Sequence, residues 1–171
     1  MSVQQLFDLT GKVAFITGGS RGLGLQMAEA LGELGASIAI SARKQHELDA
    51  AKEHLEGLGV KVVTIAADLG NLEGIPALGD HVVEQLGDID ILVNNVGGTI
   101  WAQPFEYYTP EQIEKEIQRS LFTTLWSCRA DLPYMLKQNG GVIVNVSSVA
   151  TRGLLRVPFG AAKGGVNAMN V

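Results

Sequence analysis

The sequence KVAFITGGSRGLG, residues 12–24, decides the fold that we expect for this chain. Its first six residues form a near-continuous apolar run, which is typical of a buried parallel strand. The glycines Gly18, Gly22 and Gly24 follow and lead into residues 23–34, which have helical periodicity. A glycine-rich turn between a strand and a helix lets the backbone approach a diphosphate, and the helix N-terminus attracts the anion. The stretch therefore predicts a dinucleotide-binding unit, which we favour over a purely structural turn.

The order of strand and helix repeats along the rest of the chain. Further apolar runs lie at residues 37–41, 60–66, 89–93 and 142–146, and helical periodicity returns at residues 46–58, 75–86 and 110–137. Residues 158–171 have the pattern of the start of another helix. Alternating strands and helices are typical of an α/β fold with a doubly wound parallel sheet. With no linker between them, we predict a single Rossmann-type domain over residues 1–171.

Composition excludes several classes of protein. The chain has 171 residues, 46% of them hydrophobic, and a net charge of -5. This balance argues against disorder and against a surface that binds nucleic acid or an anionic membrane. No apolar run approaches the roughly 20 residues that span a bilayer, and no export signal is visible at the start. We therefore expect a cytoplasmic protein with no nucleic-acid or membrane partner.

Two residue types argue against further chemistry. Cys128 is the only cysteine, so no internal disulfide can form, and its place on a helix favours a buried thiol over a nucleophile. His46, His54 and His81 have no metal-ligand spacing with a cysteine or a carboxylate cluster. We therefore predict no metal site.

The end of the second strand bears on the choice of coenzyme. NAD-binding proteins often carry Asp or Glu about 20 residues after the glycine turn to hold the ribose 2′-hydroxyl. Here the corresponding residues are Ser41, Ala42 and Arg43. Arg43 and Arg21 could converge on a 2′-phosphate, which favours NADP(H) and leaves NAD(H) possible. The alternative is that Arg43 is a solvated arginine at a strand end.

Several motifs in order resemble the short-chain dehydrogenase/reductase family. They are TGGSRGLG at residues 17–24, Asp68-Leu69, NNVG at residues 94–97, NVSS at residues 145–148 and AAK at residues 161–163. The resemblance covers essentially the whole chain and implies hydride transfer between a nicotinamide coenzyme and a small alcohol, diol or ketone. Residues 94–169 look most like the dehydrogenases of aromatic cis-dihydrodiol carboxylates from benzoate breakdown, a branch that is typically NAD-dependent. The earlier half looks more like sugar-acid and acyl-carrier-protein reductases.

The resemblance implies a role for each matching residue. Asp68 and Leu69 would line the adenine pocket, Asn95 and Gly97 would support the coenzyme, and Ser148 and Lys163 would be catalytic. Lys163 would also hold the nicotinamide ribose. The turn itself would contribute the remaining coenzyme-binding residues, Gly18, Ser20, Arg21, Gly22, Leu23 and Gly24.

Phe159 departs from the family pattern. The family has a tyrosine four residues before the lysine, which exchanges a proton with the substrate oxygen, and phenylalanine has no titratable proton. The three tyrosines, Tyr107, Tyr108 and Tyr134, all precede Ser148. We therefore predict a site that binds coenzyme but turns over poorly. Rival interpretations are a non-catalytic dinucleotide-binding module or subunit partner, and a fragment with no stable fold.

Other positions carry open alternatives. Ser120 occupies the place of a family asparagine and is either a feature of the diol branch or a helix-packing serine. Trp101 and Phe105 either line a substrate wall or belong to the core. Family members continue through two more strands after the lysine helix, so we expect a truncated chain in which strand 142–146 is an apolar edge. The long helix and the Lys163 helix normally pair between subunits, which implies a homo-oligomer, a dimer or tetramer.

Overall fold

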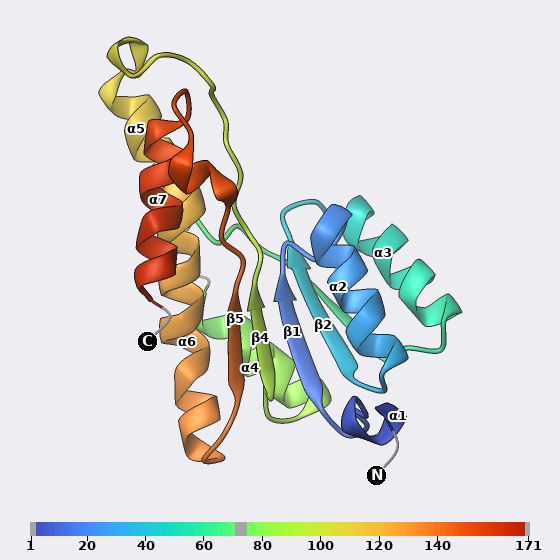
Figure 1. Cartoon of the computed structure of the whole chain (residues 1–171). Helices are drawn as coiled ribbons and strands as arrows, with labels where there is room; N and C mark the ends of the chain where they lie inside the picture. Colours follow the sequence, from blue (N-terminus) through green and yellow to red (C-terminus); the bar gives the residue numbers. More distant parts are fainter. Residues whose placement is uncertain (1–2, 71–74, 170–171) are drawn as a thin grey trace.

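Five parallel strands form one sheet at the centre of the molecule (Figure 1). They are β1 (Val13–Thr17), β2 (Ser37–Ala42), β3 (Val62–Ala66), β4 (Ile91–Asn94) and β5 (Val142–Asn145). The strand order is β3-β2-β1-β4-β5. Successive strands are added on one side of β1 up to β3, and β4 and β5 are added on its other side, so the strand order reverses between β1 and β4. These elements come from a computed structural model that describes residues 3–70 and 75–169. The predicted Rossmann-type parallel sheet is confirmed.

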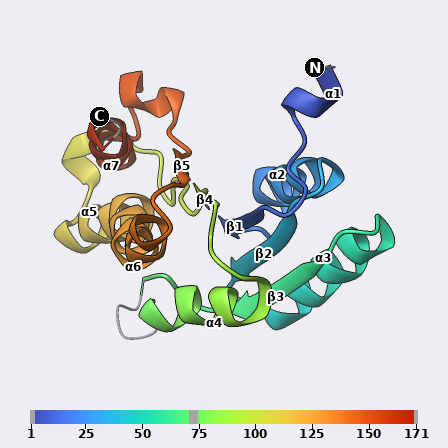
Figure 2. The same ribbon diagram turned by 90° about the horizontal axis from the view of Figure 1, so that it is seen from below.

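Helices cover both faces of this sheet. They are the short α1 (Val3–Leu6), α2 (Gly22–Glu33), α3 (Gln45–Gly57), α4 (Pro76–Leu86), α5 (Pro110–Ile117), α6 (Thr123–Lys137) and α7 (Val157–Ala168). Figure 2 shows α2 and α3 on one side of the sheet and α4 and α6 on the other.

The side chains of β1 explain how this three-layer arrangement forms. Successive side chains of a strand point to opposite faces, so Ile16 packs into a core with Leu48 and Leu55 of α3, while Phe15 packs into a second core with Val82 of α4 and Met135 of α6. Burial on both faces accounts for the near-continuous apolar runs in the sequence.

The segment 110–137, predicted as one helix, is interrupted. Thr109 caps α5 through a reciprocal capping box with Gln112, and α5 ends at Ile117. A π-helical turn, Gln118–Phe122, then separates it from α6. Such turns occur frequently at functional sites because the extra residue redirects side chains. Here the turn contains Arg119 and Ser120.

The last elements lie beside the edge of the sheet. β5 is the edge strand, and its residues Val142 and Val144 are 56% and 43% exposed, which agrees with the predicted apolar edge. The short helix η4 (Val149–Arg152) connects it to α7. Residues 170 and 171 of the predicted helix 158–171 lie outside the described residues. Within the described part, no helix combines the length and apolar character that a bilayer crossing requires.

Candidate functional site

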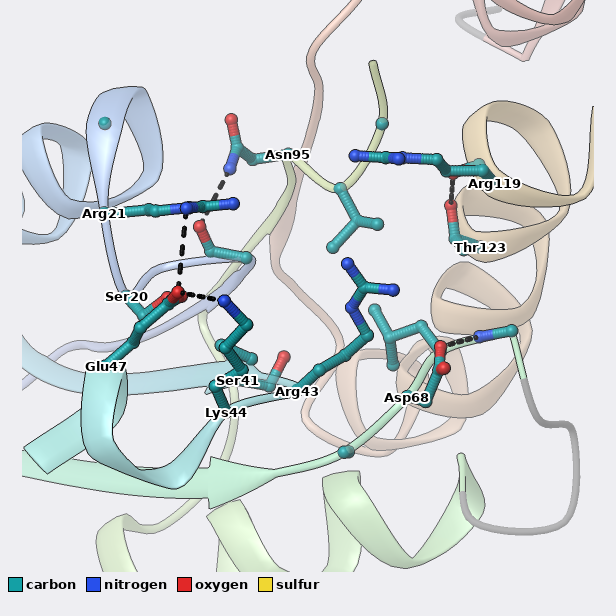
Figure 3. A pocket seen from close by; sticks show the side chains of 18 of the residues that line it. Ser20, Arg21, Ser41, Arg43, Lys44, Glu47, Asp68, Asn95, Arg119 and Thr123 are labelled. Carbon is teal, nitrogen blue, oxygen red and sulfur yellow. Dashed lines mark hydrogen bonds and ion pairs between the residues drawn. The ribbon is translucent and has the colours of Figure 1, made fainter. Parts of the chain in front are cut away.

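A cavity of about 770 Å³ lies where β1, β2, β3 and β4 end (Figure 3). This volume falls within the range of about 300–1,000 Å³ that is usual for small-molecule sites. Its position matches the rule that open α/β sheets bind ligands beyond the carboxyl ends of the strands, where the strand order reverses. Of the predicted coenzyme-binding residues, ten line it: Gly18, Ser20, Arg21, Gly22, Leu23, Arg43, Asp68, Leu69, Asn95 and Gly97.

The glycine-rich turn forms one wall of the cavity. Gly18 and Gly22 have φ angles of +67° and +55°, which favour glycine. Gly24 does not line the cavity but permits the close packing of α2, because a Cβ there would lie 2.2 Å from the Gly18 carbonyl oxygen. Arg21 at the start of α2 makes no side-chain cap bond, so the first amides of the helix remain available to an anion.

Asn95 ties this turn to the end of β4. Its Nδ2 donates to the carbonyl oxygens of Thr17 and Gly18, each at 3.2 Å. Its backbone N–H donates to Thr17 Oγ1 at 3.1 Å. These three bonds fix the wall of the cavity relative to the central strands.

A charged cluster lies at the end of β2. Glu47, in the first turn of α3, accepts a hydrogen bond from Lys44 Nζ at 3.0 Å and one from Ser20 Oγ at 3.3 Å. Arg21 Nη1 lies 3.6 Å from the same carboxylate. The bond from Lys44 and the charge of Arg21 lower the pKa of Glu47. Arg43 points into the cavity separately (Figure 3).

The predicted convergence of Arg21 and Arg43 is therefore incomplete. Both residues line one cavity, but Arg21 is turned towards Glu47. Sequence reasoning missed Glu47 because it considered only the residues at the strand end. A carboxylate in the first turn of the next helix was the available signal, since helix α3 begins two residues after Arg43.

Ser41 provides an unsatisfied group beside this cluster. Its hydroxyl is buried, lines the cavity and has no hydrogen-bond partner among residues 3–70 and 75–169. Buried polar groups without partners are uncommon and carry a free-energy cost. A polar ligand in the cavity could satisfy it.

The opposite wall is built by the residues after β3 and by the π-helical turn. Leu69 is 4% exposed, and the Asp68 carboxylate accepts a bond from the Gly70 amide at 3.0 Å. Gln118 Nε2 donates to the Gly70 carbonyl at 3.1 Å and so joins the two segments. Arg119 extends into the cavity across from Arg21 (Figure 3). Arg119 was not predicted, because helical periodicity does not reveal a π turn.

Lys163 meets the β4 loop at Gly97. It is 3% exposed, and its Nζ donates to the Val146 carbonyl at 2.6 Å. A Cβ at Gly97 would lie 2.9 Å from Lys163 Nζ and 3.7 Å from Ser120 Oγ. Ser120 is fully buried and accepts a bond from the Gly98 amide at 3.3 Å. Burial lowers the pKa of Lys163. The structure thus gathers two of the four predicted catalytic positions around one glycine.

The other two predicted catalytic positions lie at the start of η4 and on α7. Ser148 Oγ accepts a bond from the Ala150 amide at 3.1 Å and caps η4. Phe159 is 7% exposed, one turn before Lys163 on α7. Ser120, Ser148, Phe159 and Lys163 all lie outside the set of residues that line the cavity.

No tyrosine of the described part lines the cavity. The Tyr108 hydroxyl shares its one hydrogen between the carbonyls of Trp101 and Leu155, and Tyr134 donates to Asp80. Tyr107 is 69% exposed. The structure therefore supplies no substitute phenol for the position of Phe159.

Two aromatic side chains and the cysteine, which the sequence left open as candidates, lie outside the cavity lining. Phe105 is 52% exposed, so its interpretation as a core residue is wrong, and Trp101 is half-buried; neither lines the cavity. Cys128 is half-buried, with Asn94 Nδ2 donating to its sulfur at 3.1 Å. Burial raises the pKa of this thiol, which disfavours the reactive thiolate.

The described residues contain no group of three His, Cys, Asp or Glu side chains that could hold a metal ion.

Comparison with known proteins adds a second line of evidence. A sequence profile described as short chain dehydrogenase matches residues 12–170. The chain is 50% identical over 161 residues to a 1,6-dihydroxycyclohexa-2,4-diene-1-carboxylate dehydrogenase of Pseudomonas putida, and the match covers 93% of this chain and 58% of that protein. It is 42% identical over 158 residues to the dehydrogenase of the same name from Acinetobacter baylyi, over 92% of this chain and 60% of the relative.

Solved structures share the fold. A metagenomic short-chain oxidoreductase in complex with NADP has a TM-score of 0.88 at 32% identity, over 94% of this chain and 74% of that one. An NAD+-bound xylitol dehydrogenase has a TM-score of 0.91 at 28% identity, over 94% of this chain and 63% of that one. The chain therefore spans about three fifths of the length of the curated relatives that it matches.

Proposed function

Because this chain belongs to the short chain dehydrogenase family, we propose that it binds a nicotinamide dinucleotide in its cavity and takes part in hydride transfer with a small alcohol, diol or ketone. The expected resemblance of residues 94–169 to the benzoate diol branch is confirmed by the two relatives at 50% and 42% identity. The chain covers 58% and 60% of these two relatives, so we propose its activity and substrate from its own residues as well as from the relatives' names.

One observation carries the binding proposal. The cavity joins the uncapped N-terminus of α2 at the glycine-rich turn to the edge of β4 at Gly97, where Lys163 is anchored. The turn amides would hold the diphosphate, Asp68 and Leu69 the adenine, and Lys163 the nicotinamide ribose. The unsatisfied Ser41 hydroxyl fits a polar ligand in this place.

We favour NADP(H) and expect NAD(H) to be accepted. Arg43 points into the cavity and has no ion pair within residues 3–70 and 75–169. A guanidinium suits a 2′-phosphate because it offers several donors in a planar fork. Structures of related fold carry either coenzyme, as their NADP and NAD+ complexes illustrate.

The chemistry of this chain is limited by one side chain. When bound, a nicotinamide would supply the hydride chemistry, and a nearby acid–base group must take the proton from the substrate hydroxyl in oxidation or give one to the carbonyl oxygen in reduction. Ser148 would donate a hydrogen bond to that oxygen, and Lys163 carries a positive charge at the nicotinamide end. Phe159 has no proton to exchange, so turnover is slow. The second candidate function, a non-catalytic dinucleotide-binding module, is favoured by Phe159 at the position where the family has a tyrosine.

The substrate class follows from the two curated relatives. Both are named as dehydrogenases of a ring diol that bears a carboxylate. We propose cyclic cis-dihydrodiol carboxylates as the first class to assay, with sugar acids as the second.

The test compares the chain with Phe159→Tyr. Each protein is incubated with NAD+ or NADP+ and the candidate diols, and formation of reduced coenzyme is followed by absorbance. Phe159→Tyr is expected to raise the rate by about 10² to 10⁴. Phe105→Tyr is the matched control because Phe105 is exposed and lies outside the cavity wall. Equal rates for the two variants would show that the proton takes another route; coenzyme binding without turnover in both would support the non-catalytic module.

Assembly and compartment complete the proposal. Leu132 and Leu136 of α6 are 41% and 66% exposed, which suits burial against a second copy in a homo-oligomeric dimer or tetramer. Light scattering of the purified chain measures this directly. The single cysteine fits our proposed cytoplasmic compartment.

A further inference from the structure

A carboxylate occupies the end of the cavity where a coenzyme 2′-phosphate would bind. Glu47 lines the cavity together with Ser20, Arg21 and Lys44. One oxygen, Oε1, faces Lys44 Nζ at 3.0 Å and Arg21 Nη1 at 3.6 Å, and the other accepts from Ser20 Oγ at 3.3 Å. Figure 3 shows this carboxylate between the two cationic side chains, while Arg43 stands apart from it.

The charges at this end of the cavity are therefore partly neutralised before any ligand arrives. Three cations, Arg21, Arg43 and Lys44, line it, and two of them already contact Glu47. Because Glu47 pairs with Arg21 and Lys44, these two cations are less available to a 2′-phosphate bound by Arg43, and the negative charge of Glu47 opposes that of the phosphate. The repulsion is moderated by water, because the Arg21 and Lys44 side chains are 72% and 56% exposed.

The same carboxylate acts in the opposite sense on a coenzyme without the phosphate. A ribose 2′-hydroxyl can donate a hydrogen bond to a carboxylate, which is how Asp or Glu at a strand end selects NAD. The end of β2 has Ala42 and Arg43 instead. Glu47 supplies a carboxylate to this region from the first turn of the following helix.

We propose that Glu47 is a specificity-determining residue: it weakens the binding of the 2′-phosphate, favours the 2′-hydroxyl and so sets the balance between NADP(H) and NAD(H). This inference rests on the proposed function, because it assumes that the adenosine end of the coenzyme lies beside Arg43.

The experiment measures dissociation constants for NADPH and NADH by coenzyme fluorescence in the chain and in Glu47→Gln. Glutamine keeps the shape and the hydrogen-bonding capacity but removes the charge. The preference for NADPH over NADH is expected to rise about tenfold, as is reasonable for losing one repulsive charge at a partly solvated site. Glu53→Gln on the same helix is the control because Glu53 is exposed and lies outside the cavity wall.

A second variant removes the opposite charge at the same end of the cavity. Lys44→Met removes a cation that lines the cavity and contacts Glu47, so the phosphate loses an attraction and the preference is expected to move towards NADH. This variant is the control that shows the sign of a charge change at this place. Circular dichroism of each variant gives the folding control.

Four outcomes separate the possibilities. A change of preference in opposite directions for Glu47→Gln and Lys44→Met supports the inference. An unchanged preference in Glu47→Gln, within twofold of Glu53→Gln, overturns it, and so does an equal loss of both coenzymes, because Glu47 would then only shape the site. If no folded variant binds either coenzyme, the proposed function fails instead.

Discussion

Replacing Gly24 by alanine tests the packing that brings α2 against the end of β1. The added Cβ would lie 2.2 Å from the Gly18 carbonyl oxygen and 2.6 Å from Asn95 Nδ2. Non-bonded carbon contacts are favourable only near about 3.5 Å and beyond, so the turn would have to move by roughly 1 Å. The movement would also disturb the 3.2 Å bond between Asn95 and the Gly18 carbonyl.

The size of the effect follows from the cost of overpacking. Inserting a methyl group into a filled site costs typically about 1–3 kcal/mol. If binding requires the native turn, that strain weakens coenzyme binding by roughly 5- to 150-fold, since about 1.4 kcal/mol corresponds to a factor of ten. If the strain is expressed in folding instead, it lowers Tm by about 2–4 °C per kcal/mol for a domain of this size.

The assay is a fluorescence titration with NADPH, together with thermal unfolding of the same samples. Gly57→Ala is the matched control, because a Cβ at that position, the last residue of α3, meets nothing within 4 Å. We expect Gly24→Ala to bind at least about fivefold more weakly than Gly57→Ala. A folded Gly24→Ala protein with the affinity and the Tm of Gly57→Ala would refute the packing argument.

Three further predictions address the coenzyme, the lysine and pH. Arg43→Ala should weaken NADPH binding about tenfold and leave NADH within twofold, because only NADPH carries the 2′-phosphate; titration with both coenzymes decides this. Lys163→Met should weaken either coenzyme about tenfold by removing a charged donor, and unchanged affinities would move Lys163 out of the binding site. Burial raises the pKa of Asp131 from 3.8 to about 7, so the folded protein holds this proton more tightly and stability falls as the pH rises between these values. Urea unfolding at several pH values should show Asp131→Asn removing a slope of up to about 1.4 kcal/mol per pH unit, and an identical slope in both proteins would contradict the raised pKa.

The sheet and the glycine turn were predictable because their causes are local. Strands buried on both faces must be apolar along their whole length, and the chain shows this at β1 through β5. The turn combines a strand, spaced glycines and a helix within thirteen residues, 12–24. Their placement in the structure differs from the prediction mainly at the ends, as where α2 begins at Gly22 rather than residue 23.

The π-helical turn could not be predicted from periodicity. A single inserted residue leaves the apolar spacing of segment 110–137 close to that of a helix, while the shift in hydrogen bonding turns Arg119 into the cavity and buries Ser120. Only the packing of α5 and α6 against their neighbours decides between one helix and two.

Contacts between distant segments were equally hidden. Glu47 reaches residues of the glycine turn 27 positions away, and Lys163 meets the β4 loop at Gly97. Such contacts form because the carboxyl ends of parallel strands lie at the same edge of the sheet. The sequence pattern predicts the strands but does not predict the directions in which the side chains beyond them point. The missing phenol at Phe159, by contrast, was visible from the motif, and the structure adds that the hydroxyls of Tyr108 and Tyr134 are bonded elsewhere.

The central claim is that the cavity between the glycine turn and the β4 loop receives a nicotinamide dinucleotide. Calorimetric titration of the purified chain with NADPH, followed by displacement with NADH, tests it most directly. We predict saturable binding of one coenzyme per chain, with each coenzyme displacing the other. A chain that unfolds cooperatively yet gives no saturable heat with either coenzyme would contradict the account.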